Sequence, residues 1–497
     1  MLPAVSSDLL SEARAAHRAG ALDRATIVYG KLASLSPALP EAIHVLGSLD
    51  IDREVGERGL AWLGRSLHLE PSNATFLLNS AVGLQRFSRF EEALDHLQQA
   101  LVLRPLTSAI HLNLGHVYKE FKRHREARDH YCRCIALDPT EYASYDHLSL
   151  IDDTERDLLA CVRNVDRAVA ISGLHEPDLL YRQGVYYLLL GKFVPGWDLM
   201  EYRWFAPQIL KDEKFTKPLQ TSKPGFQLGA KPGILFLWAE QGIGDEIMFG
   251  ALIAEILPHV SKLILQVDAR LQGFMRRAYP GVTLIGRNAI PAEFQYDYQL
   301  PIGSLARLFR RDRDSFSRGG LPYLSPDSGR LKECRDRLGS KSVFRIGISW
   351  HSRNGDHRCV ELESLARYLH RVDVQLVNLQ YGDFAQEIAD LNARAGFDLV
   401  IDTGVDCRND IEGLAALIRC CDLVISIGNA TTHLAGALGV KTWMMLPRFP
   451  GWRWLNEGRD SLWYRSMRVY RQPASGEWDD VLDELSRDLD GLLSSSV

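Results

Sequence analysis

The stretch "CDLVISIGNATTHLAGALG" (421–439) decides which kind of fold the C-terminal part of this chain adopts. Its apolar beginning is typical of a buried strand, "SIGNATT" of a tight polar turn, and the small-residue end of the first turns of a helix. The unpaired N–H groups at the start of such a helix point outwards, so a phosphate can bind there. The stretch therefore predicts a strand–turn–helix unit of an α/β domain with an anion site at its turn.

Short β-rich runs separated by helix-length stretches extend this pattern along the chain. They lie at 233–239, 262–267, 282–285, 296–305, 343–350, 374–380, 397–402, 422–427 and 441–446. Such alternation predicts parallel sheets with helices on both faces. We expect two doubly wound domains, at 232–330 and 331–475, with ligands bound beyond the carboxyl ends of the strands.

The N-terminal part carries a repeat with a period of 34 residues. Its prolines keep that step: Pro37, Pro71, Pro105 and Pro139. Small residues recur 24 and 12 positions before each proline, which lets two helices approach closely before the proline ends the second one. The pattern resembles the tetratricopeptide repeat. We predict an all-α solenoid over 1–173, with four clear repeats and a degenerate fifth, whose groove binds a protein; the alternative is that the repeats only scaffold or dimerise.

Residues 174–231 are expected to connect the solenoid to the α/β part. An aromatic-rich helical pair at 178–204 is predicted to cap the next domain, and the polar, Pro- and Gly-containing stretch 206–231 is predicted to be a linker.

Composition excludes several classes of function. A formal charge of −5 over 497 residues gives no reason to expect nucleic acid or an anionic membrane as partner. The chain shows neither a basic-plus-apolar leader nor an apolar run long enough to span a membrane. Eight cysteines without a C-x-x-C pair favour reduced thiols, so we expect a cytoplasmic protein.

Polar loops follow three of the predicted strands. "EQGIGDE" (240–246) provides turn glycines and acids at a helix start, but completes neither the dinucleotide fingerprint nor a P-loop. "HSRNGDHR" (351–358) provides guanidinium groups that can clamp phosphate. In the opening stretch, Asn429 and the threonines can cap the helix near His433. Each loop alone could be an ordinary turn, and their convergence favours a ligand site.

Two aromatic and arginine-rich stretches near the C-terminus have two possible roles. "PGWRW" (450–454) and "SLWYRSMRVYRQ" (461–472) could wall the ligand pocket or tie the C-terminal segment to the body. We favour the second role for Arg453, Arg465, Arg468 and Arg471.

The constellation resembles a known family. "AEQGIGDEIMFG" (239–250), "DLVISIGNATTHLAGALG" (422–439) and the C-terminal "LPRFPGWRWLNEGRDSLWYRSMRVYRQ" (446–472) look like bacterial tetratricopeptide-repeat glycosyltransferases. The catalytic half of those enzymes is related to heptosyltransferases and has the GT-B architecture of two Rossmann-like domains. Flagellin-modifying transferases share this layout. In GT-B proteins the last helix, here within 476–497, often crosses back to the N-terminal sheet, and we expect the same here.

The resemblance implies that a sugar moves from a nucleotide-activated donor to a protein hydroxyl, with inversion and without a metal or other cofactor. Asp245 would be the general base. The helix start at Thr431 to His433 would hold the donor phosphate, and Arg358, or else Arg353, would neutralise it. The residues proposed to contact the donor are Gly242, Gly244, His351, Ser352, Arg358, Gln380, Asn429, Thr431, Thr432 and His433.

One departure from the family leaves alternatives open. Many relatives carry Asp-Thr where this chain has Gly428–Asn429, and that aspartate orients the donor site. Its loss suits a different sugar or nucleotide, or a decayed transferase that serves as a scaffold or ligand-sensing adaptor. A lipid or saccharide acceptor is a third alternative. Repeat proteins often pair, so a homodimer is also open.

Overall fold

The structure is a computed structural model that describes residues 2–211, 217–318, 320–339, 343–352, 358–395 and 397–495. It divides into two compact units, Met1–His175 and Glu176–Val497.

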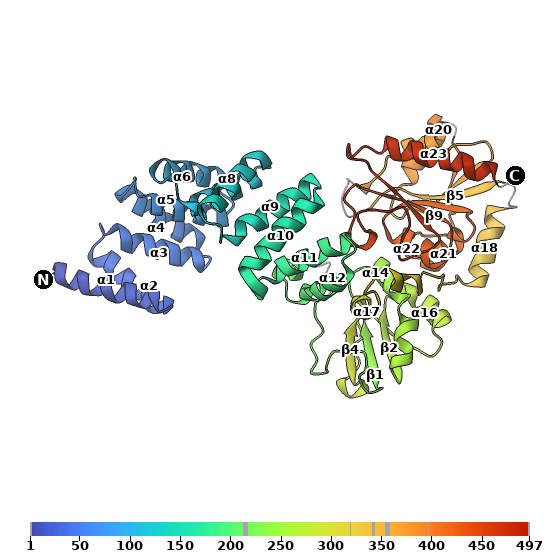
Figure 1. The fold of residues 1–497 in the computed structure, drawn as a ribbon, viewed down its shortest axis with the longest axis horizontal. Helices are drawn as coiled ribbons and strands as arrows, with labels where there is room; N and C mark the ends of the chain where they lie inside the picture. Colours follow the sequence, from blue (N-terminus) through green and yellow to red (C-terminus); the bar gives the residue numbers. More distant parts are fainter. Residues whose placement is uncertain are drawn as a thin grey trace. The chain divides into compact units, whose positions relative to one another are not determined.

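The first unit consists of antiparallel helix pairs (Figure 1). The pairs are α1 (Leu2–Arg18) with α2 (Leu22–Leu35), α3 (Pro40–Asp52) with α4 (Gly56–Leu69), α5 (Ala74–Arg86) with α6 (Phe90–Leu103), α7 (Ser108–Glu120) with α8 (His124–Leu137), and α9 (Tyr142–Glu155) with α10 (Leu158–Ser172). Each repeat proline follows the end of the second helix by two residues. The period of 34 therefore predicted these helix ends correctly.

Small residues hold the two helices of a pair close together. A Cβ atom on Gly47 would lie 2.8 Å from Leu63 Cγ, and one on Gly115 would lie 2.5 Å from the ring of Tyr131. Both partners are buried. At Gly47 and Gly115, therefore, any side chain would collide with the neighbouring helix as it is placed.

A left-handed turn residue separates the two helices of every pair. Gly20, Glu54, Ser88, Lys122 and Arg156 lie 34 residues apart and have φ values of 71°, 62°, 58°, 59° and 63°. Only the first is glycine, so the sequence pattern does not reveal this position. Because Arg156 keeps the step, the backbone of the degenerate fifth pair follows the same repeat.

The second unit begins with helices that pack on its α/β body. They are α11 (Pro177–Leu189), α12 (Phe193–Met200) and α13 (Pro207–Lys211). The Trp197 ring lies edge-on to Trp452 and Trp463, at centroid distances of 5.5 and 6.4 Å. Residues 212–216 of the predicted linker lie outside the described part, and Phe226 beyond them is buried in the core.

Two parallel sheets form the body of this unit (Figure 1). The first has the order β3-β2-β1-β4, and the second β10-β9-β8-β5-β6-β7. The strands are β1 (Ile234–Trp238), β2 (Lys262–Val267), β3 (Thr283–Gly286), β4 (Tyr298–Pro301), β5 (Phe344–Ser349), β6 (Val374–Asn378), β7 (Leu399–Val400), β8 (Leu423–Ile427), β9 (Thr442–Leu446) and β10 (Met467–Arg471). All but β10 lie where the sequence predicted a strand.

Helices connect the strands and cover both sheets. They are α14 (Ile243–Gly250), α15 (Ile253–Ile256), α16 (Gln272–Ala278), α17 (Leu305–Phe309), α18 (Ser328–Leu338), α19 (Leu362–Leu369), α20 (Ala385–Ala395), α21 (Ile411–Ile418), α22 (Ala430–Ala437) and α23 (Asp479–Ser494). We call the part around the first sheet, up to α17, the first lobe, and the part around the second sheet the second lobe.

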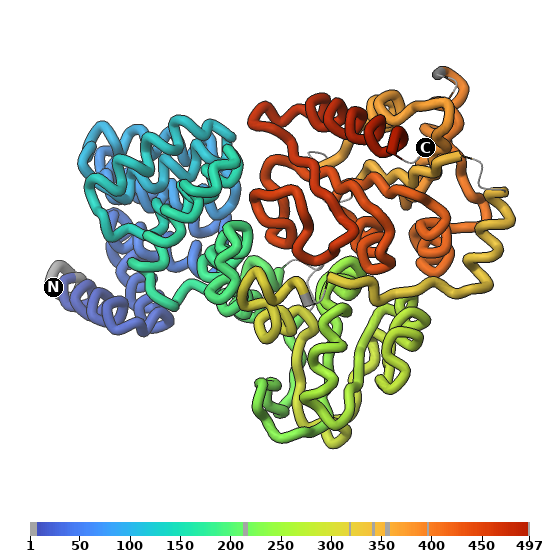
Figure 2. The backbone as a smooth tube through the Cα atoms, turned by 45° about the vertical axis from the view of Figure 1, so that its right-hand side comes forward, coloured from blue at the N-terminus to red at the C-terminus, as the bar shows by residue number. Residues whose placement is uncertain are grey.

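The C-terminal helix corrects one expectation. Helix α23 does not cross back to the first sheet but packs on α19 and β10 of the second lobe (Figure 2). Its buried face, which includes Val481, Leu482 and Leu485, belongs to the core of that lobe. Arg371 fixes the helix further by donating to Asp490 at 2.7 Å. The apolar stripe predicted the helix correctly, but the helix covers the nearer sheet.

Candidate functional site

A cavity of about 440 Å³ lies between the two lobes of the second unit. It is lined by segments that follow β1, β2, β5, β6, β8 and β9, together with the segment before α21, the start of that helix and the turn at 451–454. Segments beyond the carboxyl ends of parallel strands are where α/β sheets bind ligands. The residues that line the cavity are Gly242, Ile243, Gly244, Asp245, Ile247, Arg270, Ser352, Arg358, Tyr381, Cys407, Arg408, Ile411, Leu414, Gly428, Asn429, Ala430, Thr431, His433, Leu434, Leu446, Pro447, Gly451, Arg453 and Trp454.

The first lobe contributes the start of α14. Gly242 is the N-cap of this helix. A Cβ on Gly244 would lie 3.1 Å from Cδ2 of His433, so glycine at this position lets α14 pack against α22 of the second lobe. Gly244 therefore shapes the cavity through close approach of the backbone, whereas a Cβ on Gly242 would have no atom within 4 Å.

Asp245 lies on the first turn of α14 with its carboxylate already engaged. The residue is 8% exposed. Arg453 Nε and Nη2 both lie 2.6 Å from Asp245 Oδ1. The predicted base is thus in the cavity wall, where it forms an ion pair with an arginine of the second lobe.

The two other acids of the same turn serve the fold. Glu240 is buried and accepts hydrogen bonds from Arg203 Nε and Nη2, each at 2.9 Å. Glu246 is fully buried, and burial raises the pKa of its carboxyl to about 7. It accepts the N–H of Asp268 at 2.8 Å and does not line the cavity. Of the three acids, only Asp245 faces the ligand space.

The second lobe contributes the start of α22. Asn429 caps the helix by accepting the N–H of Thr432 at 3.3 Å, and its amide donates to Ser349 Oγ at 2.8 Å. Thr431 is 1% exposed, and its hydroxyl has no hydrogen-bond partner among the described residues. Because Thr431 lines the cavity, its hydroxyl is available to a ligand there.

His433 is a neutral group in the cavity wall. Its ring stacks on Trp454 with centroids 4.9 Å apart, and Nδ1 lies 3.0 Å from the Tyr464 hydroxyl. Burial, followed by the charge of Arg453, lowers the pKa of His433 to about 3. The side chain can exchange a hydrogen bond with a ligand but cannot act as a cation at neutral pH.

Arginines give the cavity a positive character. Arg270, Arg358, Arg408 and Arg453 line it, whereas Asp245 is the one acid among the described lining residues. Burial, followed by the charge of Arg453, lowers the pKa of Arg358. The buried Nε of Arg358 lacks a hydrogen-bond partner within the described ranges. Arg270 is paired with Asp268 at 2.9 Å, so the positive character comes mainly from the other arginines, and such guanidinium groups suit an anionic ligand.

Three side chains that were predicted to contact the donor do not face the cavity. Gln380 Oε1 accepts hydrogen bonds from Ser349 Oγ and from the N–H groups of Trp350 and His351, so this amide ties β5 to β6. The ring of His351 packs on Phe384, and Thr432 Oγ1 donates to the carbonyl of Ile427 at 2.5 Å. None of the three side chains lines the cavity. Ser352 does line it, and Arg353 to His357 lie outside the described residues.

Sequence reasoning missed Arg270 and Arg408 and undervalued Arg453. Arg270 follows β2, so extending the strand-end rule to that strand would have found it; Arg408 lies in a segment without a motif. The predicted structural role holds for Arg471, which donates to the carbonyl oxygens of Trp454 and Leu455. Arg453, by contrast, lines the cavity.

Gly428 also lines the cavity. A Cβ on Gly428 would lie 3.2 Å from Leu446 Cδ2 and 3.4 Å from Trp454 Nε1. The indole of Trp454 therefore crowds the space that a side chain at position 428 would need. The wall at this point carries an N–H donor.

Comparisons with known proteins support the repeats. Residues 72–140 match the tetratricopeptide repeat family. Protein FlbA of Caulobacter vibrioides is 28% identical over 321 residues, which make up 60% of this chain and 52% of that protein. The chain thus spans about half the length of this curated relative. It contains tetratricopeptide repeats, which commonly form protein-binding grooves.

Solved structures resemble the chain over about two-fifths of its length or less. PilF of Pseudomonas aeruginosa is 16% identical, covering 42% of this chain and 95% of its own with a TM-score of 0.38. PilW, a type IV pilus biogenesis factor, is 16% identical, covering 41% and 97% with a TM-score of 0.38. YrrB, a TPR protein with an unusual peptide-binding site, is 17% identical, covering 34% and 86% with a TM-score of 0.30.

Two features are absent from the described residues. None of the described helices combines the length and the apolar character needed to cross a membrane. Nor does the described part of the chain place three or more His, Cys, Asp or Glu side chains where they could hold a metal ion. Metal independence stays a prediction.

Proposed function

We propose that the chain is an inverting, metal-independent glycosyltransferase of GT-B architecture. It moves a sugar from a nucleotide-activated donor to Ser or Thr hydroxyls of a protein that the repeats recruit. The observation that carries the proposal is the cavity between two parallel-sheet lobes. One wall presents Asp245, and the other presents the start of α22 and a guanidinium, Arg358, without a described acidic partner.

Each group has a role in the transfer. Asp245 takes the proton of the acceptor hydroxyl while that oxygen attacks the anomeric carbon from the face opposite the leaving group. The new C–O bond forms as the bond from the anomeric carbon to the phosphate oxygen breaks, and the nucleotide leaves with the electron pair. Arg358, the Thr431 hydroxyl and the N–H groups at the start of α22 stabilise its charge.

The repeats supply the acceptor in this proposal. Tetratricopeptide grooves commonly bind proteins, and an aspartate base suits a hydroxyl acceptor. Flagellin is the acceptor that the family resemblance suggests, and the site would work in the cytoplasm, where nucleotide sugars are available.

A ligand-sensing adaptor is the second candidate, because two observations favour it. Arg453 neutralises the proposed base, and Gly428 removes the acid that many relatives carry. Such a protein would bind a nucleotide in the same cavity without transferring a sugar.

Nucleotide binding is the first test. A panel of nucleotides and nucleotide sugars is added to the full chain and thermal unfolding is followed; a ligand at a hundred times its dissociation constant adds about 2.7 kcal/mol. We expect a stabilising hit that Arg358→Gln weakens and Arg459→Gln leaves unchanged, since Arg459 pairs with Glu484 outside the cavity. If no member of the panel stabilises the protein, the transferase proposal fails.

Transfer itself is the second test. Asp245→Asn should lower sugar transfer by roughly 10²- to 10⁴-fold while nucleotide binding persists. Asp490→Asn, an exposed carboxylate on α23, is the control. Nucleotide binding with no transfer by the wild type favours the adaptor. Deleting residues 1–140 should abolish transfer to protein and spare nucleotide binding; normal transfer by the truncated chain would show that the repeats do not recruit the acceptor.

A further inference from the structure

Arg453 connects the proposed base with the anion-binding side of the cavity. It comes from the second lobe, and its guanidinium reaches into the first lobe, where it donates to Asp245 at 2.6 Å and to Gln241 Oε1 at 3.0 Å. The guanidinium lies over the ring of Trp452, 4.3 Å from its centroid. The side chain is 23% exposed and lines the cavity, so a ligand can reach it.

The same contact occupies one oxygen of the proposed base. Arg453 Nε and Nη2 both lie 2.6 Å from Asp245 Oδ1, so this oxygen has little capacity left to receive the proton of an acceptor hydroxyl. Neither of these contacts involves Oδ2, so loss of the arginine would give Asp245 a second oxygen that can accept the proton.

An anion in the cavity provides the competing partner. Arg358 and Arg453 both line the cavity, and Asp245 is the one described acid there to serve them. A phosphate group offers several strong acceptor oxygens, and charge-assisted bonds from two guanidinium groups to one phosphate are strong. The arginine that stands nearest to the carboxylate is thus also placed to bind the donor.

We propose that Arg453 is a donor-sensing latch on Asp245. Its guanidinium holds Oδ1 of the carboxylate; donor phosphate competes for the guanidinium and thereby frees Oδ1 for the acceptor hydroxyl. Arg453 is a positioning residue in this scheme, which rests on the proposed function. Donor binding thereby favours deprotonation of the acceptor, because both carboxylate oxygens can then accept its proton.

A double-mutant cycle measures the latch without any need for turnover. Asp245→Asn, Arg453→Gln and the double variant are unfolded thermally, with and without saturating inorganic pyrophosphate as the probe. The coupling between the two positions is the non-additive part of their changes in Tm. We expect a clear coupling without pyrophosphate and a much smaller one with it.

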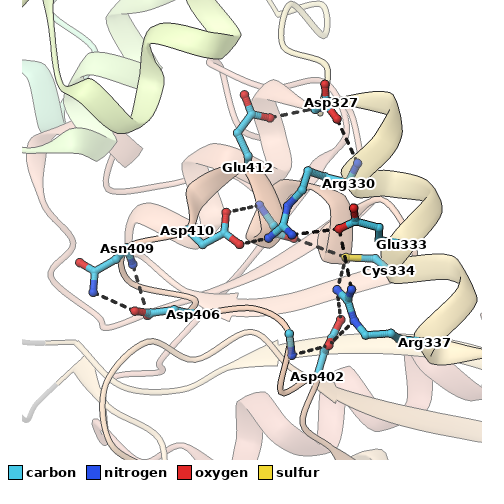
Figure 3. Close-up of polar contacts among 12 residues, drawn as sticks. Asp327, Arg330, Glu333, Cys334, Arg337, Asp402, Asp406, Asn409, Asp410 and Glu412 are labelled. Carbon is cyan, nitrogen blue, oxygen red and sulfur yellow. Dashed lines mark hydrogen bonds and ion pairs between the residues drawn. The ribbon is translucent and has the colours of Figure 1, made fainter.

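A second ion pair between the lobes is the matched control. Arg277 Nη2 on α16 donates to Glu412 Oε1 and Oε2 at 2.7 and 2.8 Å, and neither residue lines the cavity. Glu412 also accepts the N–H of Asp327 just before α18, beside the ion pairs that fasten this helix to the second lobe (Figure 3). The cycle of Arg277→Gln and Glu412→Gln should give the same coupling with and without pyrophosphate.

Kinetics supply a readout that a purely structural role would not move. Arg453→Gln should raise the KM for the donor roughly tenfold or more, because a charge-assisted bond is lost, with a smaller change in kcat. Arg453→Lys keeps a cation that can serve either partner and should recover most of the donor KM. This variant also replaces Arg453→Gln in the cycle if the glutamine variant does not fold.

The outcomes separate the latch from the transferase. An unchanged coupling between positions 245 and 453 in the presence of pyrophosphate overturns the latch. If the nucleotide panel still gives a hit, the transferase proposal survives that result. A pyrophosphate that does not stabilise the wild type also overturns the latch, and a panel without hits then removes the transferase as well.

Discussion

The two units use charged side chains differently. In the repeat unit, the described ion pairs join residues at most 34 positions apart: Arg14, for example, pairs with Glu41, 27 residues further on. In the α/β unit, Arg453 reaches Asp245 across 208 residues, and the Asp245 side chain is 11% exposed. Short-range pairs connect a repeat only to itself or to its neighbour. Long-range pairs fix where distant segments meet, which is what a ligand site requires.

The largest effect on stability should come from the buried ion pair between Arg203 and Glu240 in the α/β unit. Arg203→Met leaves the carboxylate of Glu240 buried without its cation and should cost about 3–5 kcal/mol of unfolding free energy in denaturant titrations. Arg14→Met in the repeat unit should cost much less, because both partners of that pair remain solvated. Equal losses for the two variants would remove the distinction between the units.

Low pH should destabilise the repeat unit through a buried histidine. His44 is buried, its Nδ1 faces Ser66 Oγ, and its Nε2 receives the amide of Asn79 at 2.9 Å, so the fold accepts the neutral ring. Burial lowers the pKa of His44 from 6.5 to about 4. The unfolded chain therefore binds the proton first, and stability is complete above about pH 6.5 and declines towards pH 4, by about 3 kcal/mol in total.

Thermal unfolding of the repeat unit between pH 7 and 4 checks this expectation. His44→Leu removes one titrating group and should make the decline smaller, whereas His68→Leu, at an exposed position of α4, should not. Part of the decline should persist, because burial also lowers the pKa of His130 to about 4. If the His44 variant loses stability between pH 7 and 4 to the same extent as the wild type, other groups cause the acid sensitivity.

Helix approach within a repeat gives the next effect. Gly115→Ala places a methyl group 2.5 Å from the buried ring of Tyr131 and should cost about 1–3 kcal/mol in chemical denaturation. Gly64→Ala has no atom within 4 Å and sits inside α4, so it should stabilise by about 0.5–1 kcal/mol. Stability changes of opposite sign would show that helix spacing determines the effect at Gly115 and helix propensity the effect at Gly64.

The smallest effect concerns the left-handed turn residue. Ser88 has φ 58°, which glycine adopts without steric cost, so Ser88→Gly should stabilise the repeat unit by about 1 kcal/mol. Ser34→Gly, within α2, should destabilise by a similar amount because glycine is a poor helix former. If Ser88→Gly destabilises the repeat unit, the serine side chain contributes more to stability than the left-handed backbone conformation costs.

Periodicity made the fold largely predictable. The 34-residue repeat located the helix pairs, and short β-rich runs located nine strands. Both signals lie in the local sequence, so they do not depend on the tertiary fold. Strand β10 was missed because "MRVYR" (467–471) alternates arginine with apolar residues and was interpreted as a pocket wall or as a tie to the body of the protein, not as a strand. The left-handed turns were missed because Glu54, Ser88 and Lys122 carry no glycine signature.

The candidate site was predictable in its backbone and less so in its side chains. The turn glycines and the helix start at Asn429 follow from the strand–turn–helix pattern. Gln380 and Thr432 belong to the right loops, but their side chains satisfy buried backbone groups, and a sequence does not show which way a side chain points. Arg408 reaches the cavity only through the tertiary fold.

One continuous apolar core runs through the cap helices and both lobes, joining Trp197, Leu235, Val424 and Trp452. The two lobes therefore have separate sheets but are expected to unfold together. Calorimetry of the second unit should show a single melting transition rather than one for each sheet. A substitution in either lobe should lower the melting temperature of both, so a lesion far from the cavity can disable it by thermodynamic coupling alone.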